Sequence, residues 1–225
     1  MDSVLGLFPL NTVLLPGAAL RLHVFEDRYK SMMAQCIEQH VPFGVLLDRK
    51  GNEVGEDLDP VDVGTAAVIR QVTKLPAGRL FVVAQGTRRF RVDRVLGTTP
   101  FWRAQISFLE EIDGPSDSAS RLRETAIERF KDYLGALLAV SGSELETIDL
   151  PSDAAASSYI IADALQVSVA VKQKFLEATS AAERLRAELK VLDEETHRLR
   201  SLRSEGSRAR RRSRESPFSA RFSLN

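Results

Sequence analysis

Residues 5–47 contain a dense succession of strand, turn and helix signals that restricts the possible folds of this chain more than any other segment. The apolar residues between positions 7 and 15 are interrupted or followed by Pro9, Pro16 and Gly17. Proline donates no backbone hydrogen bond and glycine tolerates positive φ, so these residues suit strand edges and turns. The opening of the chain is therefore predicted to be strand and turn, an arrangement that indicates a binding fold rather than a catalyst.

A helix and further strands are predicted next. Residues 26–39 carry apolar side chains at the i, i+3, i+4, i+7 spacing of an amphipathic helix, and residues 43–47 form an apolar run of strand length. From residue 63 to residue 111, strand patterns alternate with short turns, and short connections favour antiparallel neighbours. Such strands, with one early helix at an end, would bury their apolar face by curling into a partly closed barrel.

The pattern changes at residues 114–118, where Gly-Pro-Ser-Asp-Ser ends the strand region and helical spacing begins. Helices are predicted over residues 122–138, from 151 or 152 to 165, over 168–178 and from 181 to about 203. The last helix places Leu185, Leu192 and Leu199 seven residues apart. This narrow apolar seam favours packing inside a helical bundle, and a dimer or a partner helix is the alternative.

Several short motifs occur in one order along the chain. They are Phe8-Pro9-Leu10, Leu14-Leu15-Pro16-Gly17, Leu22-His23-Val24-Phe25-Glu26-Asp27-Arg28-Tyr29, Phe43-Gly44-Val45, Gly64-Thr65-Ala66-Ala67-Val68-Ile69, Gly86-Thr87-Arg88-Arg89-Phe90-Arg91-Val92 and Phe101-Trp102-Arg103-Ala104. Their order and spacing closely resemble the N-terminal substrate-binding domain of Lon, the ATP-dependent protease, over residues 4–202. The resemblance implies a pseudobarrel of the PUA-like type.

The predicted fold class is α+β, with an N-terminal PUA-like antiparallel β pseudobarrel that carries one early helix, followed by a C-terminal helical bundle. We expect a Lon-type β subdomain at residues 1–113, a helical bundle at 114–202 and a basic, disordered tail at 203–225.

Groups that could catalyse a reaction or hold a metal are not arranged for either purpose. No Gly-x-x-x-x-Gly-Lys-Ser/Thr run occurs, although whole Lon proteases need such a loop to cradle phosphates. The three histidines lie far apart, and one cysteine cannot build a structural zinc site. We expect Cys36 to be a buried apolar residue rather than a nucleophile. The sequence predicts no enzyme activity, no ATPase or peptidase module, no metal and no cofactor.

Charge is distributed unevenly although the chain is neutral overall. Residues 203–225 contain seven arginines and two glutamates, a net charge of +5, which leaves −5 on the first 202 residues. The candidates for contacting nucleic acid are Arg208, Arg210, Arg211, Arg212 and Arg214. Such a tail can neutralise phosphates without sequence preference. No aromatic residue lies among these arginines to stack on bases, so a solvated extension is the competing interpretation.

By resemblance, the expected activity is non-catalytic recognition of unfolded or tagged polypeptide by a stand-alone Lon-type substrate-binding domain, in a role such as protein quality control. The family's contact surface, carried onto this sequence, implicates Arg28, Tyr29, Lys30 and Met33. Arg28 and Tyr29 match the motif, and the other two are neighbours on the same helical surface. An open barrel edge could accept an added strand, with apolar pockets at the seam with the helical bundle.

Two further charges have a predicted structural role. Glu26 lies at a helix start, where it complements the helix dipole, and it is expected to pair with an arginine of the later strand, such as Arg89. The alternative is that these charges form the rim of a ligand groove.

Two other functions stay open, namely an RNA-associated PUA-like module that uses the arginine-rich tail and an adaptor for a separate protease or chaperone. The expected partners are unfolded or partly folded polypeptides, a separate ATPase, protease or chaperone, and RNA. No apolar run reaches the ~20 residues of a membrane span, so no membrane partner is expected. The Met1-Asp2-Ser3 opening lacks a basic leader, which favours a cytoplasmic location.

Overall fold

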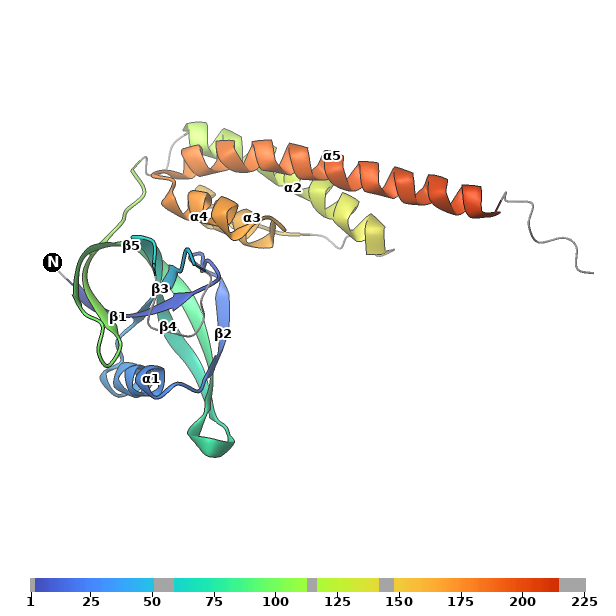
Figure 1. Ribbon diagram of the computed structural model, residues 1–225. Helices are drawn as coiled ribbons and strands as arrows, with labels where there is room; N and C mark the ends of the chain where they lie inside the picture. The colour runs from blue at the N-terminus through green and yellow to red at the C-terminus, as the bar shows by residue number, and fades with distance from the viewer. Residues whose placement is uncertain (1–2, 51–58, 113–116, 142–147, 215–225) are drawn as a thin grey trace, which may run out of the picture.

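The computed structural model describes residues 3–50, 59–112, 117–141 and 148–214, with the side chains of all of these except 117, 140, 141 and 206–214. Figure 1 shows a β-barrel at one end of the molecule and a layer of helices packed at the other. The predicted α+β class, with a barrel, one early helix and C-terminal helices, is confirmed.

Six strands form the barrel: β1 (Ser3–Leu10), β2 (Ala19–Val24), β3 (Phe43–Leu47), β4 (Val63–Lys74), β5 (Leu80–Gly97) and β6 (Trp102–Phe108). Their order is β2-β5-β4-β3-β1-β6, and an additional pairing of β5 with β6 closes five of them into a ring. Closure is possible because β5 is 18 residues long, so that its first part pairs with β2 and its last part with β6. β2 consequently lies outside the ring.

The sheet is mixed, whereas the sequence predicted an antiparallel one. β1 and β3 pair in parallel from Leu7–Gly44 to Leu10–Leu47. The chain passes through β2 and the first helix between these two strands, and such a crossover returns it in the same direction. The remaining pairings are antiparallel.

Gly86 is the point on β5 where the strand crosses the segment that leads into β2. A Cβ at this position would lie 2.5 Å from the Leu15 carbonyl oxygen, so only glycine allows the close approach. The Gly86 backbone donates to the Ala18 oxygen and accepts from the Gly17 N–H, both at 2.9 Å. These bonds fix the register of β2 on the outside of the ring.

The early helix α1 (Asp27–Gln39) lies against one end of the barrel, as Figure 1 shows. Its buried residues are Tyr29, Met32, Met33 and Cys36, which is the apolar stripe that the sequence predicts. These side chains join a core cluster with residues of β1, β2, β3 and β5, so the helix is held by apolar packing.

Four helices follow the barrel: α2 (Asp117–Ser141), α3 (Ala154–Ala164), α4 (Val169–Glu177) and α5 (Ala181–Arg214). The Asp153 carboxylate accepts from the Ala156 N–H and begins α3, while the Ser168 hydroxyl begins α4 in the same way. Leu185 and Leu192 are completely buried, so the predicted leucine seam packs within the chain. α5 continues to Arg214, beyond its predicted end near residue 203.

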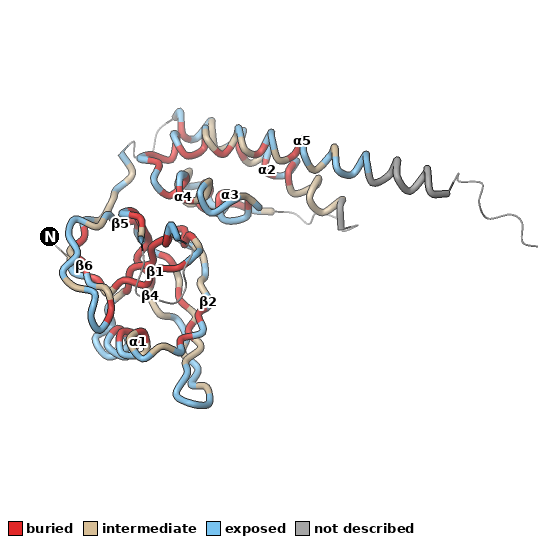
Figure 2. Tube along the Cα trace, in the orientation of Figure 1, coloured by how far each residue is buried: buried red, intermediate tan, exposed pale blue. Residues whose placement is uncertain are grey.

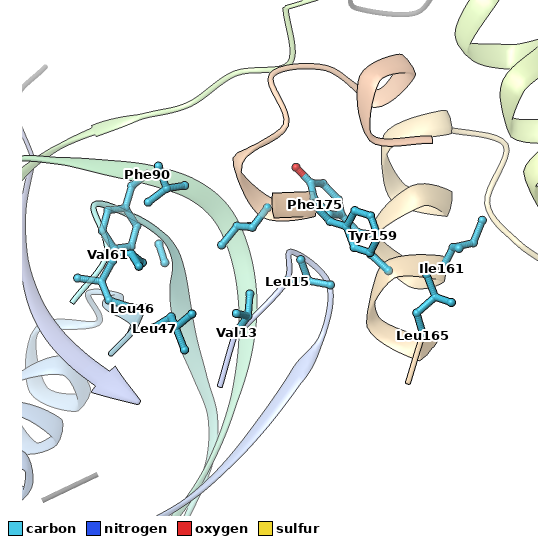
Figure 3. Close-up of a cluster of buried hydrophobic side chains, with 14 of the residues drawn as sticks. Val13, Leu15, Leu46, Leu47, Val61, Phe90, Tyr159, Ile161, Leu165 and Phe175 are labelled. Carbon is cyan, nitrogen blue, oxygen red and sulfur yellow. The ribbon is translucent and has the colours of Figure 1, made fainter. Parts of the chain in front are cut away.

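One apolar core extends from the barrel into the helices. Figure 3 shows Val13 and Leu15 of the barrel facing the side of the helical layer that carries Tyr159 and Phe175. Apolar side chains are therefore packed across the seam between the two parts, and the predicted apolar pockets there stay a prediction.

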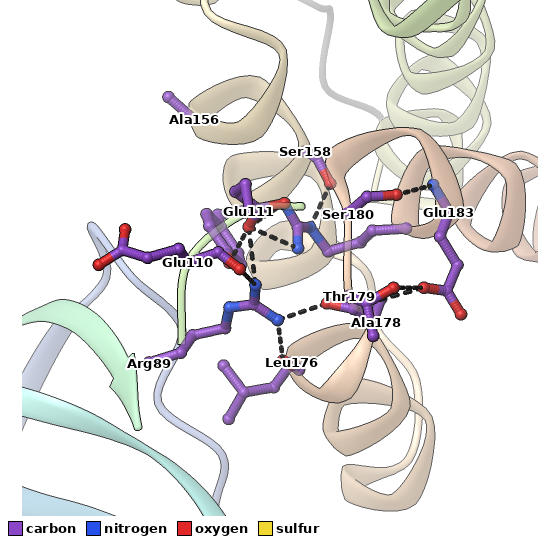
Figure 4. Close-up of polar contacts among 12 residues, drawn as sticks. Arg89, Glu110, Glu111, Ala156, Ser158, Leu176, Ala178, Thr179, Ser180 and Glu183 are labelled. Atoms are coloured by element: carbon purple, nitrogen blue, oxygen red, sulfur yellow. Dashed lines mark hydrogen bonds and ion pairs between the residues drawn. The ribbon is translucent and has the colours of Figure 1, made fainter. Parts of the chain in front are cut away.

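A buried polar network crosses the same seam (Figure 4). Arg89 of β5 is 3% exposed and donates to the backbone oxygen of Leu176 at 2.9 Å and to that of Ala178. Its guanidinium also lies 3.1 Å from Glu111, which follows β6. The barrel is thus bonded directly to the end of α4.

Glu111 is shared by groups from three elements. One of its oxygens accepts from Arg89, from the Tyr159 hydroxyl of α3 at 2.8 Å and from Arg184 of α5 at 3.3 Å. Arg184 is fully buried and lies over the Tyr159 ring at 3.8 Å. A single carboxylate therefore neutralises two buried arginines at the junction of barrel and bundle.

We predict that Glu111→Ala destabilises the protein by about 3 kcal/mol or more, because Arg89 and Arg184 would keep buried charges without a counter-ion. Glu110→Ala is the matched control: its partner Arg88 and Glu110 itself are both exposed, so the cost should stay below about 1 kcal/mol. Urea denaturation of both variants measures the difference. Equal destabilisation of the two would contradict the role given to Glu111.

Glu188 of α5 adds a pH dependence to this network. It is fully buried, it accepts from the Ser158 hydroxyl at 2.6 Å, and its other oxygen has no hydrogen-bond partner among the described residues. Burial raises the pKa of Glu188 from 4.5 to about 8, and the Ser158 hydrogen bond and the nearby Arg184 charge act in the opposite direction. Between these two values the folded protein holds a proton that the unfolded chain releases.

The contribution of Glu188 to the free energy of unfolding should therefore be fully present below pH 4.5 and should be lost as the pH rises toward about 8. The slope from this one group is at most about 1.4 kcal/mol per pH unit. Glu188→Gln removes the titration and keeps an acceptor for Ser158. We expect the urea midpoint of this variant to rise relative to that of the wild type as the pH increases from 5.5 to 8.5. If the two midpoints changed with pH in the same way, Glu188 would not hold a buried proton.

Candidate functional site

A groove runs along β2 toward the start of α1, and we call it the β2 groove. It has a volume of about 280 Å³ and is lined by Phe8, Leu10, Arg21, Leu22, His23, Val24, Phe25, Glu26 and Tyr29. The Phe8 and Tyr29 rings stack at 4.0 Å and form its apolar floor. Phe25 stands at the junction of β2 and α1 with 53% of its surface exposed. The groove therefore offers apolar surface that water reaches.

The outer edge of β2 borders this groove and has no strand beside it. Among the strands that the structure describes, β2 pairs only with β5. The Gly86 N–H donates to the Ala18 carbonyl oxygen, so the carbonyl group of Ala18 faces β5. Residues of an antiparallel strand face the partner strand alternately, and the backbone N–H groups of Arg21 and His23, at odd spacing from Ala18, therefore face away from β5. A row of backbone donors and acceptors is thus available at the rim of an apolar groove.

Charged side chains surround the start of α1. Arg28 donates to the Glu26 carboxylate at 2.8 Å, and its guanidinium lies 4.6 Å from the centre of the Tyr29 ring. Lys30 pairs with Asp27 at 2.6 Å and lowers the pKa of that carboxyl. Burial raises the pKa of Tyr29, so its ring enters the groove as a neutral group.

The structure brings only part of the predicted contact set to the groove. Tyr29 lines it, and Arg28 covers the Tyr29 ring. Lys30 is half-buried and pairs with Asp27 outside the lining, and Met33 is completely buried in the barrel core. Met33 therefore packs in the core cluster that also contains Phe8 and Tyr29. A role in contacting a ligand stays a prediction for all four residues.

The two predicted pinning charges separate in the structure. Glu26 lines the β2 groove and pairs with Arg28 instead of with an arginine of the later strand. Arg89 lies at the seam with the helices. The five arginines predicted to contact nucleic acid, at positions 208 to 214, have side chains outside the described residues, so that prediction is untested.

Sequence reasoning missed the residues that form the groove itself, above all Phe8, Leu10, His23 and Phe25. Phe25 had a visible signal, because it ends a strand pattern with an aromatic residue immediately before a helix. Phe8 and Leu10 read as ordinary strand residues. Their place in the groove depends on the position of β2 outside the ring, which no local pattern encodes.

A second hollow of about 300 Å³ lies between the end of α1 and β4, lined by Cys36, Ile37, His40, Val41 and Val68–Val72. Burial raises the pKa of the Cys36 thiol to about 11, so it stays protonated and behaves as the predicted apolar residue. No group of three or more metal-ligating side chains exists within the described ranges. Across those ranges, no helix is both long and apolar enough to cross a bilayer.

These features define a class of domain: a β-barrel with one strand edge left open beside an apolar groove, bonded through a buried ion network to a helical bundle. The sequence profile described as "ATP-dependent protease La (LON) substrate-binding domain" matches residues 4–194. The chain therefore belongs to the family of Lon substrate-binding domains, as the sequence motifs indicated.

Full-length relatives and solved structures agree with this assignment. The chain is 25% identical over 213 residues to a Lon protease of Bacillus thuringiensis (strain Al Hakam), covering 93% of this chain and 27% of that protein. It is 26% identical over 190 residues to a Lon protease of Buchnera aphidicola, covering 82% and 24%. The chain thus spans about a quarter of the length of these proteases.

Among solved structures, a Lon N-terminal domain protein from Xanthomonas campestris superposes with a TM-score of 0.63 at 27% identity, over 84% of this chain and 98% of that one. The N-terminal domain of a Mycobacterium avium complex Lon protease has a TM-score of 0.61 at 20% identity, over 85% and 98%. The second likeness supports the fold alone.

Proposed function

We propose that this protein recognises unfolded or partly folded polypeptide without cutting it, by adding an extended client segment to the outer edge of β2. The observation that carries the proposal is the unpaired β2 edge beside the β2 groove. Strand addition supplies main-chain hydrogen bonds that do not depend on sequence, while a neighbouring groove selects side chains.

The groove favours an apolar side chain. A client residue placed beside the edge would contact the Phe8 and Tyr29 rings and the exposed face of Phe25. Folded proteins bury both their apolar side chains and their backbone groups, so a segment that offers both together is a mark of an unfolded chain. This gives the site a physical basis for selecting clients by folding state.

Family membership supports the same proposal, since the matching profile describes a substrate-binding domain. The proposal includes handover of the bound chain to a separate ATPase, protease or chaperone, in cytoplasmic protein quality control. Recognition by strand addition needs no cofactor, because hydrogen bonds and apolar contact account for binding.

Strand addition can be tested with His23→Pro. Proline removes the outward N–H of residue 23 and places a ring on the free edge, while the ladder with β5 keeps its bonds. His23→Ala is the matched control, because it loses the same imidazole contact with Phe81 but keeps the N–H. We expect Kd for a reduced and alkylated unfolded protein to rise at least tenfold in the proline variant relative to alanine.

Equal Kd values for these two variants, with unchanged thermal unfolding, would refute strand addition at β2. Fluorescence anisotropy of the labelled client provides the affinities.

The apolar part of the site can be tested with Phe25→Ala. Phe25 is more than half exposed, so its removal should leave stability nearly unchanged and cost about 1 kcal/mol of client burial, or about fivefold in Kd. Ile112→Ala provides the control, since Ile112 is 75% exposed and lies outside the groove lining. If both variants bound the client as wild type does, the groove would have no part in recognition.

A further inference from the structure

We propose that the outer face of β5 and β6 binds the phosphate backbone of nucleic acid without sequence preference. The face is defined by Arg91, Arg94, Arg103, Gln105 and Ser107, and we call it the arginine face. It is independent of the β2 groove, since β6 and β2 lie on opposite sides of the barrel in Figure 2.

The strand register brings these side chains together. Arg91 pairs with Ser107 and Arg94 with Gln105, while Arg103 lies two residues before Gln105 on β6. The alternate residues Ala104 and Ile106 are completely buried, and the three arginines are exposed, so the arginines share the outer side of the sheet. Diagonal neighbours on such a face lie about 7 Å apart, close enough for adjacent arginines to contact one chain.

None of the three arginine side chains forms a hydrogen bond or an ion pair within the described part of the molecule. Some arginines elsewhere do find partners, as Arg88 does with Glu110 and Arg129 with Asp193. The first 202 residues carry a net charge of −5, so three unpaired arginines on adjacent strands stand out from their surroundings.

Two acidic residues lie near the arginine face. Asp93 accepts a hydrogen bond from the Ser107 hydroxyl at 2.6 Å. Asp62 is exposed and lies close to Arg91 along the backbone, because the Val92 N–H donates to the Asp62 carbonyl oxygen. The three arginines outnumber them, and the surface keeps a positive charge.

The chemistry of the face fits phosphate. Guanidinium groups bind phosphate oxygens bidentately, and a glutamine side chain such as that of Gln105 is a common additional donor to a nucleic-acid backbone. No hollow described in the structure is lined by these residues, so the face has no pocket for a specific side chain or base. The evenly spaced phosphates of a nucleic-acid backbone match such a flat, positively charged surface. An acidic peptide would instead need a groove or a strand edge.

The test is binding of a 20-nucleotide single-stranded RNA by the full chain between 50 and 200 mM KCl, followed by fluorescence anisotropy. Replacing Arg91, Arg94 and Arg103 together by Gln should weaken binding on the order of tenfold at 50 mM KCl and reduce the slope of log K against log[KCl] by about two for a single strand. The matched control removes three positive charges elsewhere, by Gln at Arg121, Arg186 and Lys190, and should change the slope little.

Two further arms make the test decisive. A variant with Gln at all five arginines from 208 to 214 separates the tail from the arginine face, and poly-glutamate as competitor separates phosphate recognition from general attraction to anions. Loss of binding in the arginine-face variant alone, with weak competition by poly-glutamate, supports the proposal. Unchanged binding in that variant, binding lost entirely with the tail arginines, no RNA binding at all, or equal competition by poly-glutamate would each overturn it.

Discussion

The Glu111 carboxylate is the interaction on which the arrangement of this molecule depends. It neutralises Arg89 from the barrel and Arg184 from the last helix, and it accepts from Tyr159 between them. Neither arginine could stay buried without it, because an uncompensated charge in the interior costs several kcal/mol. The apolar core continues across the same seam, so barrel and bundle form one folded body.

The β2 groove follows from how the ring closes. The last part of β5 pairs with β6 and closes the ring. The first part of β5 pairs with β2, which therefore lies outside the ring. A ring without β2 would lack the open strand edge that borders the groove. The structure thus brings an open backbone edge and the exposed Phe25 ring together at the β2 groove, where both could contact an extended chain.

Much of this fold could be predicted because local patterns encode it. The stripe that contains Met32 and Cys36 marked the early helix, and the heptad that contains Leu185 marked the buried face of α5. The parallel pairing of β1 and β3 and the shared carboxylate of Glu111 could not be predicted, because they join residues far apart in sequence. Met33 shows the same limit: the motif places it on a surface helix, and only the packed barrel shows that its side chain faces inward.

Hydrogen exchange of the backbone amides of β2 is the most direct measurement of the central claim, because strand addition would bond those amides to the client. With a saturating unfolded client, the amides of Arg21 and His23 should become strongly protected, while those facing β5 change little. Protection confined to the hollow between α1 and β4, with the outward β2 amides exchanging at their free rate, would contradict the account.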